Sequence, residues 1–169
     1  KINKLDLVLS GLGQYTDSFR EGTWSRAGRL TSNLRYRITD NLAVGVNVNF
    51  NTRNSASYFY WKDWGNDALR GDTTSFSTSK PTRINIDPFL TYFDDNGNRH
   101  KVLTRYYDIL NNNDNNQSNQ SQLFYGEYQF QKKFEDSDLV LTTGLVGIRT
   151  NIQAEIYGDT TYSTSNIAG

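Results

Sequence analysis

Cysteine is absent from the 169-residue sequence, and histidine occurs once. Without cysteine the chain has neither a disulfide framework nor a thiolate metal site, and a single histidine argues against a zinc centre. That histidine, His100, has no serine or cysteine partner near it in the sequence, so a catalytic triad has no starting point. We therefore expect no enzyme activity, no metal and no cofactor.

An excess of charge of either sign is also missing, because 18 Lys and Arg residues balance 18 Asp and Glu residues. The chain lacks the basic surplus that is typical of nucleic-acid-binding domains, so we expect no nucleic-acid partner. Aromatic residues make up 14% of the chain, which argues against disorder. The sequence begins at Lys1 without an initiator methionine or a signal peptide and ends without a polar tail, so we expect a segment of a longer protein.

Long apolar runs are the third absence. No stretch approaches the ~20 apolar residues that a membrane-spanning helix needs. Membrane-spanning β-strands stay compatible with the sequence, because alternation of apolar and polar residues keeps their mean hydropathy low.

Alternation with a period of two dominates the chain, most clearly over residues 42–50. One face of this stretch is apolar and consists of Leu42, Val44, Val46, Val48 and Phe50. The other face is small or polar and consists of Ala43, Gly45, Asn47, Asn49 and Asn51. This pattern predicts a strand with one apolar and one polar side.

Similar stretches occur along the whole sequence. They cover residues 5–10, 29–38, 83–92, 122–134 and 140–156, with a less regular extended stretch over 99–110. The pattern predicts about seven strands, most of ~10 residues or more, which is the length of a tilted membrane-spanning strand. In the last stretch we expect Val146 and Ile148 on the apolar side of the sheet and Arg149 on the polar side.

The connections between these strands alternate in length. Long polar connections cover residues 16–25, 55–80 and 111–121, and short turns cover 39–41, 94–98 and 135–138. Long extracellular loops and short periplasmic turns are typical of outer-membrane barrels. The predicted fold class is therefore all-β, a part of a large antiparallel transmembrane β-barrel. A soluble antiparallel β-sandwich is the alternative, because its strands also alternate between apolar and polar sides.

The most unusual loop is rich in aromatic residues, which offer flat surfaces for stacking on a ligand or a partner protein. The ligand-binding candidates in it are Tyr58, Phe59, Tyr60, Trp61, Lys62, Asp63, Trp64 and Arg70. The alternative is that these rings pack against neighbouring loops. In a barrel, the polar sides of the strands would line a hydrated interior. The candidates for that interior are Arg29, Arg35, Arg37, Asn47, Asn49, Glu127, Gln129, Arg149, Gln153 and Glu155.

Several strings resemble the barrel of TonB-dependent receptors of the Bacteroidota, in particular the SusC/RagA-like group. They are FYWKD at residues 59–63, NIDPFLTYFD at 85–94, GNRH at 97–100, YGEYQFQ at 125–131 and SNIAG at 165–169. The resemblance covers essentially the whole chain. It implies an integral protein of the Gram-negative outer membrane, in contact with its lipid, that imports a glycan, a peptide or an iron chelate with energy from the TonB system.

Such receptors have about 22 strands and a plugged lumen, so seven strands would form roughly a third of the wall. The sequence holds no recognisable plug, TonB box or closing strand, so energy coupling cannot be assigned to any residue here. Members of the group often pair with a SusD-like surface lipoprotein, which makes such a lid a further partner that the resemblance allows. A passive porin or structural barrel, and a soluble β-sandwich binding module, are the alternative functions.

Overall fold

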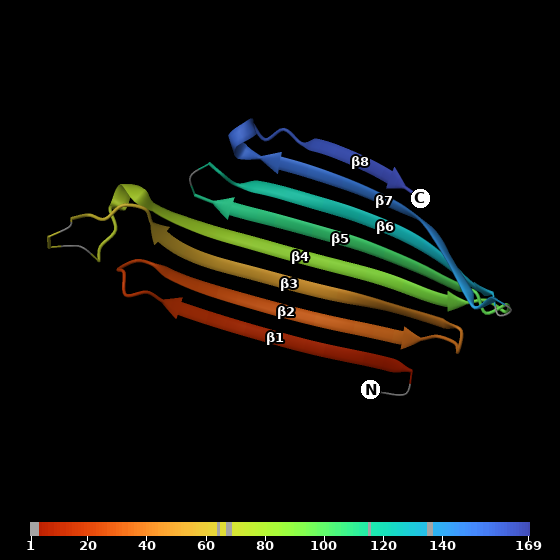
Figure 1. Ribbon diagram of the computed structural model, residues 1–169. Helices are drawn as coiled ribbons and strands as arrows, with labels where there is room; N and C mark the ends of the chain where they lie inside the picture. Colours follow the sequence, from red (N-terminus) through yellow and green to blue (C-terminus); the bar gives the residue numbers. More distant parts are fainter. Residues whose placement is uncertain (1–3, 64, 67–68, 115, 135–136) are drawn as a thin grey trace.

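The computed structural model describes residues 4–63, 65–66, 69–114, 116–134 and 137–169. Eight antiparallel strands form one open sheet in chain order, from β1 at one edge to β8 at the other (Figure 1). The strands are β1 (Leu5–Asp17), β2 (Trp24–Arg37), β3 (Leu42–Tyr58), β4 (Phe76–Phe93), β5 (Arg99–Asn113), β6 (Asn119–Phe134), β7 (Leu139–Ala154) and β8 (Tyr162–Ala168). Two short 3-10 helices, η1 (Thr73–Ser75) and η3 (Glu155–Tyr157), lie in the connections.

The predicted all-β antiparallel fold is confirmed, with one strand more than expected. The additional strand, β8, has seven residues of the sequence YSTSNIA, whose side chains give no clear apolar side. Within the described residues, no helix has the length and apolar character needed to cross a membrane.

The strands are longer than predicted, and the loops are correspondingly shorter. Ser55 pairs with Ser79 and Asn111 with Asn119, so backbone pairing continues through residues that the sequence pattern assigns to loops. The connections reduce to residues 18–23, 59–75 and 114–118 at one end of the sheet, which we call the loop end. The short turns after β2, β4 and β6 lie together at the other end, the turn end (Figure 1).

The turn between β4 and β5 shows how local chemistry fixes this end. The Asp94 carboxylate accepts hydrogen bonds from the backbone N–H groups of Asn96 and Asn98, both at 2.9 Å. These bonds, with one from the Asn98 side chain as the strongest influence, hold the pKa of Asp94 below its ordinary value. Gly97 takes φ +76°, a left-handed conformation in which an L side chain is strained.

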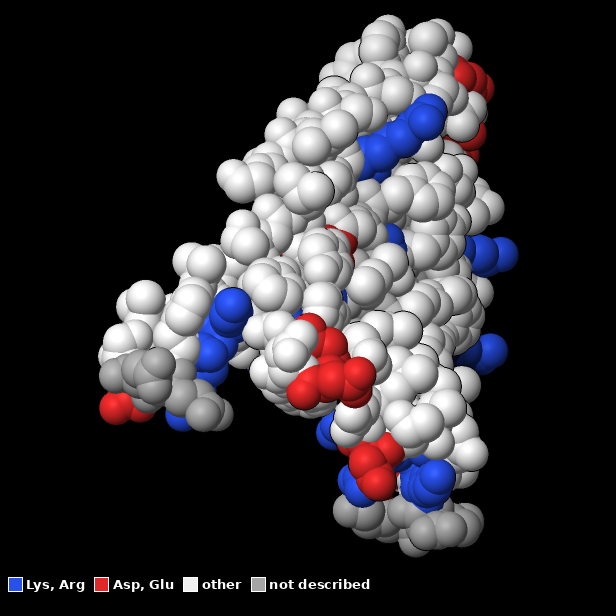
Figure 2. All heavy atoms as spheres, turned by 90° about the vertical axis from the view of Figure 1, so that its right-hand side faces the viewer, with Lys and Arg blue, Asp and Glu red and all other residues white. Residues whose placement is uncertain are grey.

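Seen from the turn end (Figure 2), charged side chains gather in patches and uncharged residues cover much of the remaining surface.

Both proline residues of the chain lie inside strand β4, where they interrupt the pairing. Pro81 lies at a gap in the β3–β4 ladder, and Pro88 lies at a gap in the β4–β5 ladder. A proline has no N–H to donate, so a missing backbone bond at each position is expected. The hydroxyl of Thr104 donates to the Pro88 carbonyl at 3.2 Å and closes part of the second gap.

The register defines two faces, because directly paired residues point to the same side of a sheet. We call the side with Val44, Val46 and Val48 the apolar face, and the side with Asn47 and Asn49 the polar face. Arg29, Arg35, Arg37, Glu127 and Gln129 also lie on the polar face.

Two of the residues expected on the polar face lie on the other side. Arg149 pairs with Phe124, and Gln153 pairs with Gln120, which places both on the apolar face. Val146 and Ile148 pair with Glu127 and Tyr125 and so lie on the polar face. Alternation groups the residues of one strand correctly, but only the pairing with β6 shows which group joins which side.

Neither face is covered by a second layer in the part of the chain that the structure describes. The buried apolar residues there are Ala43, Ala56 and Tyr58, and large apolar side chains elsewhere remain half-buried or exposed. Protein domains normally bury an apolar face between two layers. This sheet therefore presents its apolar residues outward on an uncovered face.

Candidate functional site: an apolar belt, a polar groove and an aromatic loop

The apolar residues of the apolar face do not run the full length of the strands. In β3 they extend from Leu42 to Phe50, and the same side then continues with Thr52 and Asn54 towards the loop end. The same change occurs in the neighbouring strands. The apolar set, which we call the apolar belt, consists of Leu5, Leu7, Leu9, Leu30, Leu34, Tyr36, Leu42, Val44, Val46, Val48, Phe50, Ile84, Ile86, Leu90, Tyr92, Val102, Tyr106, Phe124, Tyr128, Phe130, Phe134, Leu139, Leu141 and Leu145.

Beyond the belt, the apolar face is mostly polar, apart from Leu110 and a group at the loop end formed by Trp24, Ala56, Tyr58 and Phe76. Its polar residues in the central strands include Lys80, Asp108, Asn112, Gln120, Gln122, Arg149, Asn151 and Gln153. Some of them bond to one another across strands: the Gln120 amide donates to Asp108 at 2.9 Å, and the Gln122 amide donates to the Tyr106 hydroxyl at 3.3 Å. The apolar face therefore changes from apolar to mostly polar about half-way along the strands.

Aromatic rings gather at the turn-end border of the belt. The His100 ring lies 5.7 Å from the Tyr92 ring and 5.2 Å from the Phe130 ring, measured between centroids. Its Nδ1 is 2.8 Å from the Tyr128 hydroxyl oxygen, and its Nε2 is 3.5 Å from the Asp94 carboxylate in the turn. His100 thus joins the belt to the polar turn, and the structure gives it a place in packing and hydrogen bonding.

The belt is level across β1 to β4, where Leu7, Leu34 and Val46 share one row, and shifts towards the turn end across β5 to β7. Register places Val46, the middle of the belt in β3, level with Gly147 in β7 through Pro88, Thr104 and Gly126. The middle of the belt in β7 lies about five residues further towards the turn end, between Leu139 and Leu145. With ~3.3 Å per residue and ~4.8 Å between strands, this shift, averaged over the four strand spacings from β3 to β7, corresponds to about 40°. A strand tilt of ~35–45° is the geometry of transmembrane β-barrels.

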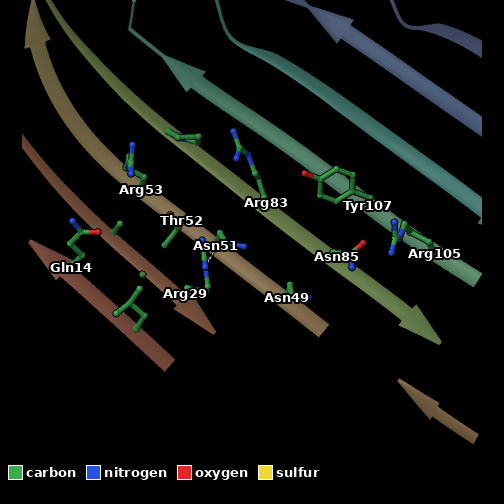
Figure 3. Close-up of a pocket in the computed structure, with 14 residues that line it drawn as sticks. Gln14, Arg29, Asn49, Asn51, Thr52, Arg53, Arg83, Asn85, Arg105 and Tyr107 are labelled. Atoms are coloured by element: carbon green, nitrogen blue, oxygen red, sulfur yellow. Dashed lines mark hydrogen bonds between the residues drawn. The ribbon is translucent and has the colours of Figure 1, made fainter. Parts of the chain in front are cut away.

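The polar face holds a groove of about 640 Å³ across β1 to β5 (Figure 3). Four arginines line it, together with asparagines and other polar residues, and none of its lining residues is acidic. The lining residues labelled in Figure 3 are Gln14, Arg29, Asn49, Asn51, Thr52, Arg53, Arg83, Asn85, Arg105 and Tyr107.

The arginines of this groove differ in their partners. Arg105 donates two hydrogen bonds to the Asp87 carboxylate, at 2.7 and 2.9 Å, so its charge is paired. Arg29 donates to the neutral amide oxygen of Asn51 at 2.6 Å and keeps its charge unpaired. Among the described residues, Arg53 and Arg83 have no hydrogen-bond or ion-pair partner. Three positive charges in the groove are therefore not compensated by a carboxylate.

Sequence reasoning did not identify Arg53, Arg83 and Arg105 as site residues. Arg83 follows the alternation of its strand, so the pattern indicates its face. Arg53 lies between the predicted strand of residues 42–50 and the predicted loop of residues 55–80, and the pattern assigns it to neither. Arg105 lies in the stretch with mixed sides. The grouping of these residues becomes visible only when the register of β3, β4 and β5 is known.

The aromatic loop divides into a packed part and an exposed part. Tyr58 is 8% exposed, its ring contacts those of Trp61 and Phe76 at 5.5 and 5.9 Å, and its hydroxyl donates to the Leu69 carbonyl at 3.1 Å. Phe59 and Tyr60 are 81% and 63% exposed, and their rings meet edge to face at 5.0 Å. Tyr58 thus packs against the loop, whereas Phe59 and Tyr60 are accessible, and the role of these residues in ligand binding stays a prediction.

The polar candidates of this loop stabilise the loop itself. Arg70 donates to Glu21 at 2.6 Å and so connects the loop to the β1–β2 connection. The Asp63 carboxylate accepts the backbone N–H of Gly65 at 3.0 Å, and the backbone N–H of Lys62 donates to the Arg70 carbonyl at 3.0 Å. Trp64 lies outside the described residues.

Glu155, expected on the polar face, begins helix η3 beyond the end of β7, and its carboxylate accepts the backbone N–H of Ser118 at 2.9 Å. It therefore stabilises the contact between two connections at the loop end.

No family model, no curated protein and no solved structure matches this chain.

Proposed function

We propose that the chain forms part of the wall of an outer-membrane β-barrel of the TonB-dependent type, which imports a solute. The observation that carries this proposal is the apolar belt on one face, which ends about half-way along the strands. In β3 the belt runs from Leu42 to Phe50, which is close to the ~9–11 residues that a tilted strand needs to cross a membrane. A β-sandwich buries the inner face of each strand along most of its length, so a belt that ends half-way favours lipid as the apolar surroundings.

The polar face supports the transport part of the proposal. In a membrane barrel the side away from lipid lines the interior, and there it carries Asn47, Asn49 and the arginine groove. Such an interior suits the passage of a hydrophilic solute. Active import, the TonB system and a SusD-like lid come with the resemblance of the sequence to its family. Loss of uptake in cells that lack TonB would separate active import from passage through a passive porin.

Single cysteines test the facing, because the natural sequence has no cysteine that would react in the background. In the protein inserted in outer membranes, Val44→Cys and Val46→Cys should resist a water-soluble maleimide, whereas Asn47→Cys and Asn49→Cys should react. Gln153→Cys is the decisive control, since it shares the apolar face with Val46 but lies beyond the belt, and it should react as well. Equal labelling at positions 46 and 47 would refute the proposal.

Epitope tags test the sidedness. A tag inserted after Asn113, at the loop end, should be accessible to antibodies on intact cells, and a tag at Asn96, at the turn end, should become accessible only after the outer membrane is permeabilised. The reverse pattern would contradict the predicted orientation.

A further inference from the structure

We propose that the groove on the polar face binds an anionic solute that carries two or more carboxylate or phosphate groups. This inference rests on the proposed function, since it names the chemical class of the solute. The binding residues are Arg29, Arg53 and Arg83, assisted by the neighbouring asparagines.

The three arginines come from three neighbouring strands and lie on one side of the sheet (Figure 3). Arg29 and Arg83 both pair with Asn51, one from each side, and Arg53 is two residues further along β3. With ~4.8 Å between strands and ~6.6 Å for two residues along a strand, all three Cα atoms lie within about 10 Å of one another. One small molecule with two or three acidic groups can therefore reach all three guanidinium groups.

Guanidinium groups suit this class of ligand because their planar N–H donors match carboxylate and phosphate oxygens in pairs. Asn49, Asn51 and Asn85 add amide groups that can bond to hydroxyl or carboxylate oxygens of the same molecule. The groove volume of about 640 Å³ falls within the ~300–1,000 Å³ that small-molecule sites occupy.

The carboxylates of this face are bonded to other residues and leave Arg29, Arg53 and Arg83 without an acidic partner. Asp87 holds Arg105, the fourth arginine of the groove, and also accepts a hydrogen bond from Asn85 at 2.8 Å. Further along, Glu127 accepts hydrogen bonds from Tyr125 and Gln129. The sheet thus supplies carboxylates beside β5 and β6 but none in the lining around Arg29, Arg53 and Arg83.

The groove also has a suitable position along the strands. The row formed by Arg29, Asn51 and Arg83 is one residue beyond the row of Phe50 and Ile84, which is the loop-side border of the apolar belt in β3 and β4. In the proposed barrel, a solute that enters from the loop end would meet the arginines before it reaches the level of the belt.

Isothermal titration of the full chain in detergent, with citrate and pyrophosphate as probes and glucose as the neutral control, tests the inference. We expect saturable binding of at least one anionic probe, weakened by added salt because the contacts are ionic. The double variant Arg53→Gln/Arg83→Gln should raise its dissociation constant at least tenfold, and Arg53→Lys/Arg83→Lys should lose less. A preference for citrate or for pyrophosphate would distinguish a carboxylate solute from a phosphate solute.

Arg99→Gln is the matched control, because Arg99 is on the same face and loses the same charge, but lies about ten residues, roughly 30 Å, from the level of Arg83. Its dissociation constant should stay within twofold of the wild type. Circular dichroism checks that the variants keep the sheet, and the single variant Arg83→Gln replaces the double variant if the latter does not fold.

Absence of binding by both anions, or equal binding by the wild type and the arginine-to-glutamine variant, would overturn the inference. Neither result touches the membrane proposal, which depends on the cysteine labelling at positions 46, 47 and 153. Protected belt cysteines without anion binding would refute the anionic solute alone, whereas freely labelled belt cysteines would refute the wall itself.

Discussion

The substitution Val46→Arg places a charge in the middle of the apolar belt, between the paired residues Leu34 and Pro88. On the lipid side of a transmembrane barrel, an arginine near the membrane midplane costs ~2–4 kcal/mol of folding free energy. Val46 is the central residue of the belt in β3, so the upper half of this range is expected. At ~1.4 kcal/mol for each factor of ten, a cost of ~3–4 kcal/mol lowers the folding equilibrium roughly 140- to 720-fold.

Two control variants separate membrane burial from other causes of instability. Asn47→Arg adds the same charge one residue away on the polar face, opposite Asp87, and should cost less than about 1 kcal/mol. Asn54→Arg adds it on the apolar face beyond the belt and should be equally mild. The assay is reversible unfolding in denaturant with the protein in lipid vesicles, followed by tryptophan fluorescence.

The outcome that refutes this reasoning is a specific one. If Asn54→Arg destabilises the protein as much as Val46→Arg does, the apolar face is buried along its whole length, as in a soluble sandwich. If Val46→Arg costs nothing, the belt does not lie in apolar surroundings at all.

Three further predictions concern the ends of the sheet. Phe59→Ala/Tyr60→Ala should weaken solute uptake without lowering stability, whereas Tyr58→Ala should lower the free energy of unfolding by about 3 kcal/mol because its ring is buried. Loss of stability in the double variant with unchanged uptake would assign the exposed pair to packing. The pKa of Asp94 is lowered in the folded state, so this carboxylate stabilises the protein above the ordinary carboxyl pKa of ~4, and the stabilisation is lost as the pH falls through the lowered value. The variant Asp94→Ala should therefore flatten this part of a plot of unfolding free energy against pH. Gly97→Ala should cost about 1 kcal/mol in the same denaturant titration, since φ is +76° there and the space around a new Cβ is open; an unchanged midpoint would contradict the strain argument.

The sequence predicts the strands where alternation is regular, and it is less informative where both sides of a strand are polar. Residues 42–50 alternate between apolar and polar side chains, and they form the core of β3 as expected. The loop-end continuation of β3 through Ser55 reads as a loop, because nothing in its side chains reveals that backbone pairing continues. The same limit applies to β8.

The facing of β7 shows a second limit. Val146 and Ile148 alternate with Arg149, and an apolar row is expected to join the apolar rows of the other strands. In the structure the register with β6 places these two residues beside Glu127 and Tyr125 instead. Register depends on contacts between strands, and a change of one residue exchanges the two sides of a strand. The grouping of Arg29, Arg53 and Arg83 could not be predicted from the sequence, because it also depends on the register between strands.

The proposed membrane location is compatible with the negative mean hydropathy of the chain, because the apolar residues are concentrated in the belt. A sheet that crosses a membrane needs apolar side chains on one face only, and on that face only over the thickness of the membrane. Here the belt occupies about half the length of one face, so roughly a quarter of the strand positions meets the requirement. The remaining positions can be polar, and the arginines of the groove occupy some of them on the opposite face. Mean hydropathy is therefore a poor guide for such a chain, whereas the confinement of apolar residues to one part of one face is a specific one.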